Sequence, residues 1–468
     1  MTGRDLVIRA RRMVSADGEE AVAAGGDRRR SGRGWGRGAG YEACAGGVPG
    51  EASGGVEPFD AEVPGAEEVR LADDEVLMPG LVDSHVHVND PGRAEWEGFP
   101  SATRAAVAGG VTTLVDMPLN SIPPTVDVPA LEVKRAAAAD RVYLDVGFWG
   151  GAVPGNLACL RPLHDAGVFG FKCFLLHSGV DEFGHLDTGQ VEAAMRELAT
   201  FDGLLIVHAE DHEAIAGAPA CSGTDYRGFL DSRPGEAENR AVRTVVELAR
   251  RTGCRVHILH VSSAGVVPII AEARAGGVRV TAETCPHYLA LVAEEIPDGA
   301  TEYKCCPPIR ERANRDRLWE ALREGVIDLV VSDHSPSTPD LKHLDTGDFG
   351  TAWGGISSLQ LGLSVVWTEA RARGFGLADV VRWMAQAPSE LAGLRRKGRI
   401  APGYDADLCV FAPEEEFVVA ARSLYHRNAI TPYDGRRLKG VVRRTWLRGA
   451  PVDLDAAPRG RLLVRGDD

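Results

Sequence analysis

The chain has 468 residues, of which 44% are hydrophobic and 25% charged, as in ordinary globular proteins that bury a large core. Its 67 acidic residues exceed its 52 basic residues, and the net charge of −15 argues against a surface for nucleic acid or anionic lipid. No apolar run reaches the roughly 18 residues of a membrane span, so we expect neither a nucleic-acid partner nor a membrane.

The N-terminal part, residues 1–78, is expected to combine short strands with one irregular segment. Its start lacks the apolar core of a signal peptide, and the nine cysteines form no CxxC pair, which predicts a cytoplasmic protein. Residues 5–10 and 67–77 contain partly alternating apolar positions, as short strands do. Residues 25–55 are rich in glycine and arginine, which predicts a disordered loop insertion. An RNA-binding tail is the alternative, disfavoured because the segment contains few aromatic residues.

The middle part, residues 79–398, alternates apolar β-branched runs with amphipathic stretches. Eight such runs predict strands at 81–85, 112–116, 142–147, 169–174, 204–208, 255–261, 279–283 and 328–332. Strands that alternate with helices pair in parallel through βαβ crossovers. The pattern therefore predicts the α/β class and a (β/α)₈ barrel, with its active site at the carboxyl ends of the strands.

The C-terminal part, residues 399–468, contains short apolar runs at 406–411, 417–420 and 441–447, separated by proline and glycine turns. Neither terminal part has enough apolar surface to fold alone. We therefore predict that both ends of the chain together form one small β-sandwich domain beside the barrel.

Polar side chains occur where several of the predicted barrel strands end. His85 and His87 lie at the end of the first strand, and residues two apart in an extended chain face the same side. Four more polar residues end other strands, namely Lys172, His208, His260 and Asp333. A single buried histidine is usually structural, but the convergence of this set at one end of a barrel predicts a metal centre.

Motifs along the chain resemble those of a known enzyme family. The family is that of the cyclic amidohydrolases in the amidohydrolase superfamily. The motifs of this chain that resemble theirs are PGLVDSHVHVNDPG, GFKCF, VHAE, HVSS, ETCPHY, VSDHSP and GRIAPGYDADLCVF. Their allantoinase branch is most similar, through DMPLN, PPIR and AWGG. The resemblance covers residues 5–8 and 67–452 and is lost across 25–55. It implies a barrel hydrolase that opens the cyclic amide of allantoin to give allantoate, with homotetramers as the common assembly.

The resemblance also implies two divalent metal ions in each subunit. Their implied ligands are His85 and His87 for the more buried ion, and His208 and His260 for the second. Lys172, carboxylated by CO₂ to N6-carboxylysine, would bridge the ions, and Asp333 would be both a ligand and the catalytic acid–base. Burial supports this because it lowers the pKa of a lysine, whose neutral amine reacts with CO₂. Histidine and carboxylate ligands suit zinc, the first choice, but also manganese, cobalt or iron.

Two departures from related enzymes bear on the substrate. Dihydroorotases typically carry an arginine where this chain has Asn89, and an amide cannot replace a guanidinium that holds a carboxylate. Hydantoin and dihydropyrimidine hydrolases typically carry a tyrosine where this chain has His177. Both substrate types stay as alternatives to allantoin. For this neutral ring the expected partners are Asn120, Ser335 and the backbone of Cys306.

Two further histidines follow the last predicted strands and could line the pocket. These are His287, in the motif CPHY, and His334, directly after Asp333. For His334 the favoured alternative is that it orients a metal ligand, as residues next to ligands more often do. A non-catalytic relative acting as a scaffold is disfavoured, because the chain keeps all six implied metal ligands.

Overall fold

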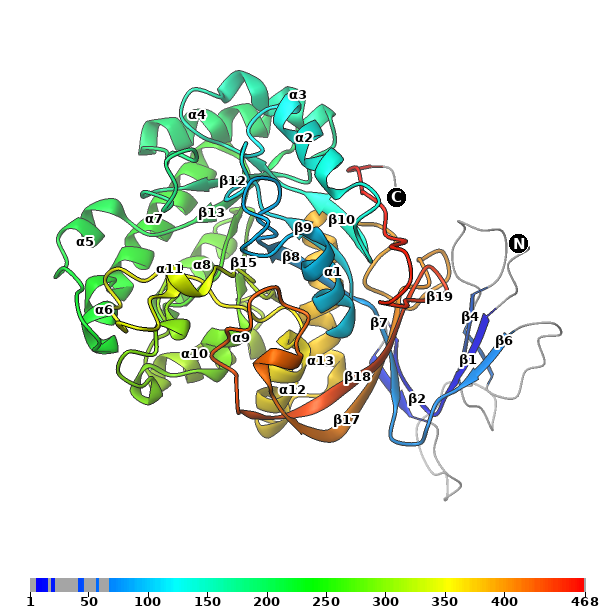
Figure 1. The fold of residues 1–468 in the computed structure, drawn as a ribbon. Helices are drawn as coiled ribbons and strands as arrows, with labels where there is room; N and C mark the ends of the chain where they lie inside the picture. Colours follow the sequence, from blue (N-terminus) through cyan, green and yellow to red (C-terminus); the bar gives the residue numbers. More distant parts are fainter. Residues whose placement is uncertain (1–5, 16–17, 22–40, 46–55, 59–66, 467–468) are drawn as a thin grey trace.

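The computed structural model describes residues 6–15, 18–21, 41–45, 56–58 and 67–466. A large barrel of strands and helices carries a smaller β lobe at one side, built from the N-terminal strands in blue and the C-terminal strands in orange to red (Figure 1). No helix in the described part of the chain is long and apolar enough to cross a membrane.

The barrel wall consists of parallel strands in chain order. These are β8 (Leu81–Val86), β9 (Val111–Asp116), β10 (Asp145–Phe148) with its continuation β11 (Gly150–Gly151), β12 (Phe171–Phe174), β13 (Leu204–His208), β14 (Arg255–Ile258), β15 (Val280–Thr284) and β16 (Leu329–Val330). Almost all their residues are buried, since helices cover the outer face, which explains the continuous apolar runs. The ring closes where the N–H of His87 donates to the carbonyl of His334 at 2.8 Å.

This arrangement confirms the predicted barrel, and each of the eight predicted strands overlaps an observed one. The last strand is shorter than predicted, because a side chain takes the place of the neighbouring strand as the hydrogen-bond partner of its backbone. The backbone N–H of Ser332 donates to the carboxylate of Asp83 at 3.3 Å instead of to a neighbouring strand.

Helices surround the barrel and continue into its loops. The α-helices are α1 (Phe99–Ala108), α2 (Val128–Ala138), α3 (Leu160–Asp165), α4 (Thr188–Ala199), α5 (His212–Ala216), α6 (Tyr226–Ser232), α7 (Gly235–Thr252), α8 (Val267–Ala275), α9 (Pro286–Ala290), α10 (Arg312–Arg323), α11 (Pro339–Lys342), α12 (Gly362–Ala372), α13 (Leu377–Val381) and α14 (Ala387–Ala392). Shorter turns are 3₁₀ segments at Leu157–Cys159, Ala264–Val266, Ala293–Glu295, Thr301–Tyr303 and Ala421–Ser423, and a π-turn at Arg382–Gln386. Local sequence sets the ends: Asp187 and Gln190 form a capping box that starts α4.

The β lobe contains two sheets. One has the order β5 (Val56–Pro58), β4 (Tyr41–Ala45), β1 (Leu6–Ala10) and β6 (Glu67–Arg70). The other has the order β19 (Ala450–Pro451), β18 (Arg437–Leu447), β17 (Leu408–Val418), β7 (Val76–Pro79), β2 (Arg12–Ser15) and β3 (Gly18–Ala21). Antiparallel pairing of β7 with β17 joins the two ends of the chain, and Ile8, Leu77, Val410 and Trp446 share one buried cluster. The predicted small β domain is therefore confirmed.

Two details of the lobe differ from the sequence-based expectation. Within 25–55, the expectation of no regular structure is wrong for Tyr41–Ala45, which pairs with β1 through its backbone and so needs no apolar pattern. Residues 25–40 and 46–55 lie outside the described residues. The expected runs at 406–411 and 417–420 belong to one strand, β17, whose pairing shifts between Ala412 and Glu416 around Pro413. Proline has no N–H to donate, so the ladder is interrupted there.

A buried ionic network connects the lobe to the barrel. The ammonium of Lys397 lies 2.7 Å from Asp145 on β10, 2.9 Å from Asp405 and 2.7 Å from Asp407 just before β17. Arg448 also pairs with Asp145. Although burial opposes it, the carboxylates of Asp407 and Asp145 raise the pKa of Lys397. The positive charge that balances these three carboxylates is therefore supplied by the protein itself, through Lys397.

Candidate metal centre and substrate cavity

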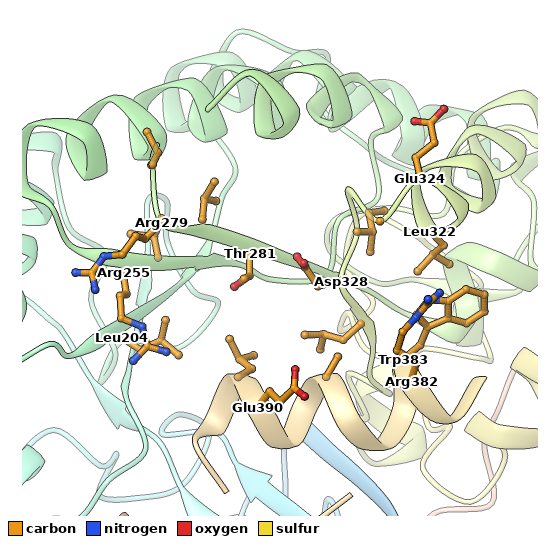
Figure 2. Close-up of a pocket in the computed structure, with 18 of the residues that line it drawn as sticks. Leu204, Arg255, Arg279, Thr281, Leu322, Glu324, Asp328, Arg382, Trp383 and Glu390 are labelled. Atoms are coloured by element: carbon orange, nitrogen blue, oxygen red, sulfur yellow. The ribbon is translucent and has the colours of Figure 1, made fainter. Parts of the chain in front are cut away.

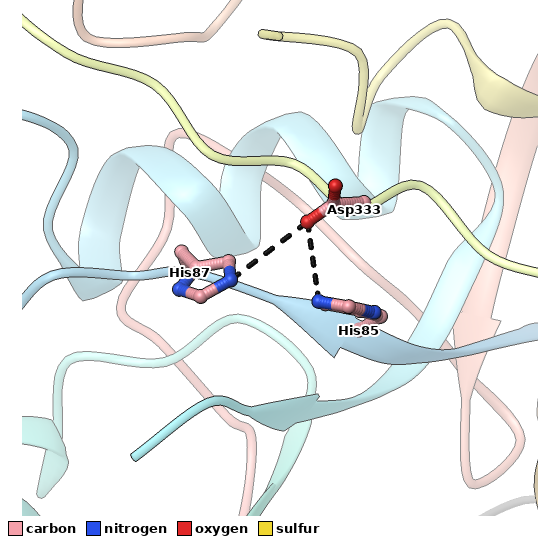
Figure 3. A group of neighbouring side chains, drawn as sticks. All are labelled: His85, His87 and Asp333. Atoms are coloured by element: carbon pink, nitrogen blue, oxygen red, sulfur yellow. Dashed lines mark ion pairs between the residues drawn. The ribbon is translucent and has the colours of Figure 1, made fainter. Parts of the chain in front are cut away.

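Six residues expected from the sequence meet at the carboxyl ends of the barrel strands. One oxygen of Asp333 lies 3.1 Å from Nε2 of His85 and 3.7 Å from Nε2 of His87 (Figure 3). The amine of Lys172 on β12 lies 3.4 Å from Nε2 of His85. At the end of β13, Nδ1 of His208 lies 2.9 Å from Nε2 of His260. All six side chains are buried.

Two of these residues have a backbone conformation that few side chains adopt. His260 has a φ of 34° and Asp333 a φ of 43°, both in the left-handed region. Such conformations cost roughly 1–3 kcal/mol and persist where surrounding contacts enforce them, often at functional sites. For His260 the contact is its backbone N–H, which donates to Glu283 at 3.3 Å.

The electrostatics of the cluster favour neutral nitrogen ligands. Burial lowers the pKa of His85, His87 and His260 well below the ordinary histidine value, so their rings are neutral and keep a free lone pair. Burial also lowers the pKa of Lys172 and raises the pKa of Asp333. Nδ1 of His260 is buried without a hydrogen-bond partner in the described chain. Neutral imidazoles around a carboxylate are a donor set that fits a divalent metal ion.

Two buried carboxylates that the sequence reasoning did not assign hold these histidines in place. Glu283 on β15 lies 2.5 Å from Nδ1 of His85. Glu210, after β13, lies 2.7 Å from Nε2 of His208 and accepts two hydrogen bonds from Arg233, at 3.0 and 2.5 Å. Both acids occur in quoted motifs, VHAE and ETCPHY. The sequence signal for both acids is a carboxylate within or directly after an apolar strand. A carboxylate buried there needs hydrogen-bond donors, so it marks a polar contact inside the barrel.

A cavity of about 340 Å³ opens onto the cluster. The three residues expected to contact substrate all line it, namely Asn120, Cys306 and Ser335. The amide of Asn120 lies 3.5 Å from Nδ1 of His87. Arg233 and Lys304 bring positive charge to the wall, while Phe174 and Trp353 supply apolar surface. Five of the six cluster residues line the cavity directly, and His85 lies beneath them.

Other residues named from the sequence have different positions. Among the described residues that form the cavity wall, His177 is present, but Asn89, His287 and His334 are not. The suggestion that His287 and His334 line the pocket is therefore wrong. Nε2 of His334 lies 3.1 Å from Glu97, and its Nδ1 accepts the backbone N–H of Ser358 at 3.1 Å. His287 is buried below the cavity, with a ring nitrogen within 4.8 Å of a carboxylate oxygen of Asp333.

A larger cavity, of about 680 Å³, lies at the opposite end of the barrel. It lies between the amino ends of the strands, at Leu204 and Arg255, and the helical segment that carries Trp383 and Glu390 (Figure 2). Active sites of such barrels lie at the carboxyl ends of the strands. We therefore place the candidate site in the smaller cavity, where the six converging side chains lie.

Comparison with known proteins agrees with this geometry. Residues 76–452 match the amidohydrolase family. An allantoinase of Streptomyces avermitilis is 60% identical over 413 residues, covering 88% of this chain and 92% of that protein. An allantoinase of Saccharomyces cerevisiae is 50% identical over 399 residues, covering 83% and 86% of the two chains. The L-hydantoinase (dihydropyrimidinase) structure from Arthrobacter aurescens has a TM-score of 0.85 and 29% identity, covering 99% of this chain and 98% of that one. The chain therefore belongs to the amidohydrolase family, as a relative of the allantoinases.

Proposed function

We propose that this protein opens the hydantoin ring of allantoin by hydrolysis to give allantoate. The observation that carries the proposal is the convergence of His85, His87, Lys172, His208, His260 and Asp333 beside one cavity. The 60% identity to an allantoinase over most of both chains supports this substrate above other cyclic amides. The hydantoinase neighbour keeps a hydantoin-type substrate as the second candidate.

The donor set fits two divalent ions, with zinc as our first choice. We assign His85 and His87 to one ion and His208 and His260 to the other, with Asp333 as a further ligand. Lys172 would join both ions as N6-carboxylysine, since its buried amine has a lowered pKa and an unmodified ammonium would repel the ions. When bound, such ions supply Lewis acidity that polarises a carbonyl and lowers the pKa of water.

The chain's own groups position the substrate and move the proton. Asn120, Ser335 and the backbone of Cys306 would hold the ring and its ureido tail by hydrogen bonds. Asp333 accepts a proton from the attacking water as oxygen bonds to the ring carbonyl carbon. When the carbon–nitrogen bond breaks, the same carboxyl returns this proton to the departing ring nitrogen.

A substrate comparison on the purified protein tests the proposal. Allantoin, hydantoin, dihydrouracil and dihydroorotate would be assayed at equal concentration, with product carboxylate measured by chromatography. We expect kcat/KM to be highest for allantoin. A higher value for hydantoin or dihydrouracil would support the hydantoinase-type reading instead, and no hydrolysis of any of them would overturn both.

The assembly is proposed on the family resemblance, and the compartment on the cysteine pattern. We propose a cytoplasmic homotetramer. Light scattering coupled to gel filtration tests the assembly, and fractionation of the source cells tests the compartment.

A further inference from the structure

We propose that His257, which lies inside the barrel and outside the cavity wall, is a positioning residue for the metal centre. It would fix the carboxylate of Glu283, and Glu283 in turn fixes the ring of His85. The inference rests on the proposed function, because it assigns His85 as a metal ligand. It adds a hydrogen-bond chain that starts at Thr281, at the opposite end of the barrel.

The chain of contacts is continuous through the barrel interior. The hydroxyl of Thr281 lies 2.7 Å from Nδ1 of His257. Nε2 of His257 lies 2.9 Å from one oxygen of Glu283, whose other oxygen lies 2.5 Å from Nδ1 of His85. Parallel pairing of β14 with β15 places His257 beside Thr281. Thr281 also lines the larger cavity, where Figure 2 shows its side chain beside Asp328.

Each proton in this chain has one consistent position. Because Nε2 of His85 faces Asp333 and must offer a lone pair to a metal, its proton lies on Nδ1 and is donated to Glu283. An ionised Glu283 only accepts, so Nε2 of His257 also carries its proton. In a neutral ring Nδ1 of His257 is then the acceptor, and the hydroxyl of Thr281 donates to it. Thr281 thus selects the tautomer of His257 that points a proton at Glu283.

Packing alone does not explain a histidine at this position. The interior of such barrels is normally filled by branched apolar side chains, and His257 is completely buried. A buried imidazole destabilises the fold unless its nitrogens are hydrogen-bonded. Here both nitrogens have partners, and both partners, Thr281 and Glu283, belong to this series of hydrogen bonds. Partners of metal-bound histidines orient the ring and typically change metal affinity by roughly 10-fold to 100-fold when removed.

The experiment measures zinc binding rather than turnover. Chelator-treated protein is titrated with Zn²⁺ against a chromophoric competitor, which resolves the number and affinity of bound ions. In His257→Leu we expect one of the two ions to bind about 10-fold more weakly or worse, while the other keeps its affinity. His257→Gln, whose amide N–H can still reach Glu283, should recover most of the loss.

A second matched pair covers the case in which His257→Leu does not fold. Thr281→Val removes the hydroxyl at almost constant volume and should weaken the same ion, whereas Thr281→Ser keeps the donor and should bind both ions normally. Wild-type affinity for both ions in His257→Leu and Thr281→Val would overturn the inference and leave the proposed function intact. Equal weakening of both ions in Thr281→Val and Thr281→Ser would also overturn it, as a packing effect. Failure of the wild type to bind zinc would overturn the metal centre itself.

Discussion

Nε2 of His208 lies 2.7 Å from the carboxylate of Glu210, while Nδ1 of the same ring lies 2.9 Å from His260. The carboxylate therefore holds a proton on the far nitrogen and leaves the near nitrogen with a lone pair toward the site. Glu210 also accepts both hydrogen bonds from Arg233, which lines the substrate cavity. One carboxylate thus orients a proposed metal ligand and a charged residue of the cavity wall.

Replacing this carboxylate should impair both functions. In Glu210→Gln we expect the ion assigned to His208 and His260 to bind roughly 10-fold to 100-fold more weakly, with a rise in KM because Arg233 loses its ionic partner. Metal titration and steady-state kinetics measure the two effects. Glu213→Gln is the control, since Glu213 is an exposed acid nearby on α5 and should leave both values unchanged. Unaltered zinc affinity in Glu210→Gln would contradict the orienting role.

Removing the proposed bridging lysine should abolish the metal centre. In Lys172→Ala we expect loss of both ions and of activity, because the four histidines and Asp333 then lack the anionic bridge. Short carboxylic acids added to this variant should restore part of both, since they fit the space left by the side chain. Elemental analysis of metal per chain, with and without propionate, is the measurement. Two ions retained in the unsupplemented variant would refute this assignment.

Replacing Asp333 by asparagine should distinguish its role in proton transfer from its role in metal binding. In Asp333→Asn the amide oxygen can still approach an ion, but it cannot carry a proton from water to the departing nitrogen. We expect kcat to fall by roughly 10²–10⁴ while KM and metal content change little. Asp340→Asn, at an exposed position of α11, controls for loss of one negative charge. Near-normal kcat with both metals bound would point to another proton carrier, with His287 the next residue to replace.

The ionic network between lobe and barrel predicts a stability effect that stays constant from pH 7 to 9. Lys397→Met leaves Asp145, Asp405 and Asp407 without their shared cation, so we expect a loss of roughly 3–5 kcal/mol in the free energy of unfolding. The folded state raises the pKa of Lys397, so its contribution is fully present below the unfolded pKa of about 10.4 and is lost as pH rises through the folded value. Urea unfolding should therefore show a constant gap between wild type and variant from pH 7 to 9.

The control for this variant is a lysine–glutamate ion pair at the surface. Lys439→Met breaks a contact of 2.8 Å with Glu416, in which the lysine side chain is 35% exposed. Such pairs contribute about 0–1 kcal/mol, so this change should have little effect. An equally small effect of Lys397→Met would show that the network does not stabilise the junction.

The sequence predicts what depends on local pattern. The barrel strands were recognisable because helices bury the outer face of the sheet and strand side chains fill the interior, so runs such as 204–207 are continuously apolar. His85 and His87 were recognisable because side chains two apart in a strand share a face. Their meeting with Lys172 and Asp333 followed from the barrel topology, in which the carboxyl ends of all strands lie at one end.

What the sequence could not predict depends on register and on backbone turns. Glu283 contacts His85 and His257 because the barrel brings three strands together, and no spacing along the chain encodes how these strands are aligned. The left-handed backbone of Asp333 turns the following side chain, His334, toward Glu97, where simple alternation would not place it. β4 pairs through backbone groups that every residue possesses.

The pairing of β7 with β17 also has a consequence for synthesis of the chain. On the ribosome, β7 emerges before any barrel strand, whereas β17 and β18 emerge only after the last barrel helix. Until then Leu77 and Ile8 have no Val410 or Trp446 to cover them, and the edge of β7 stays open to other strands. The nascent barrel therefore keeps an exposed apolar strand edge until β17 has emerged, and a chain that stops short of β17 would expose this edge permanently.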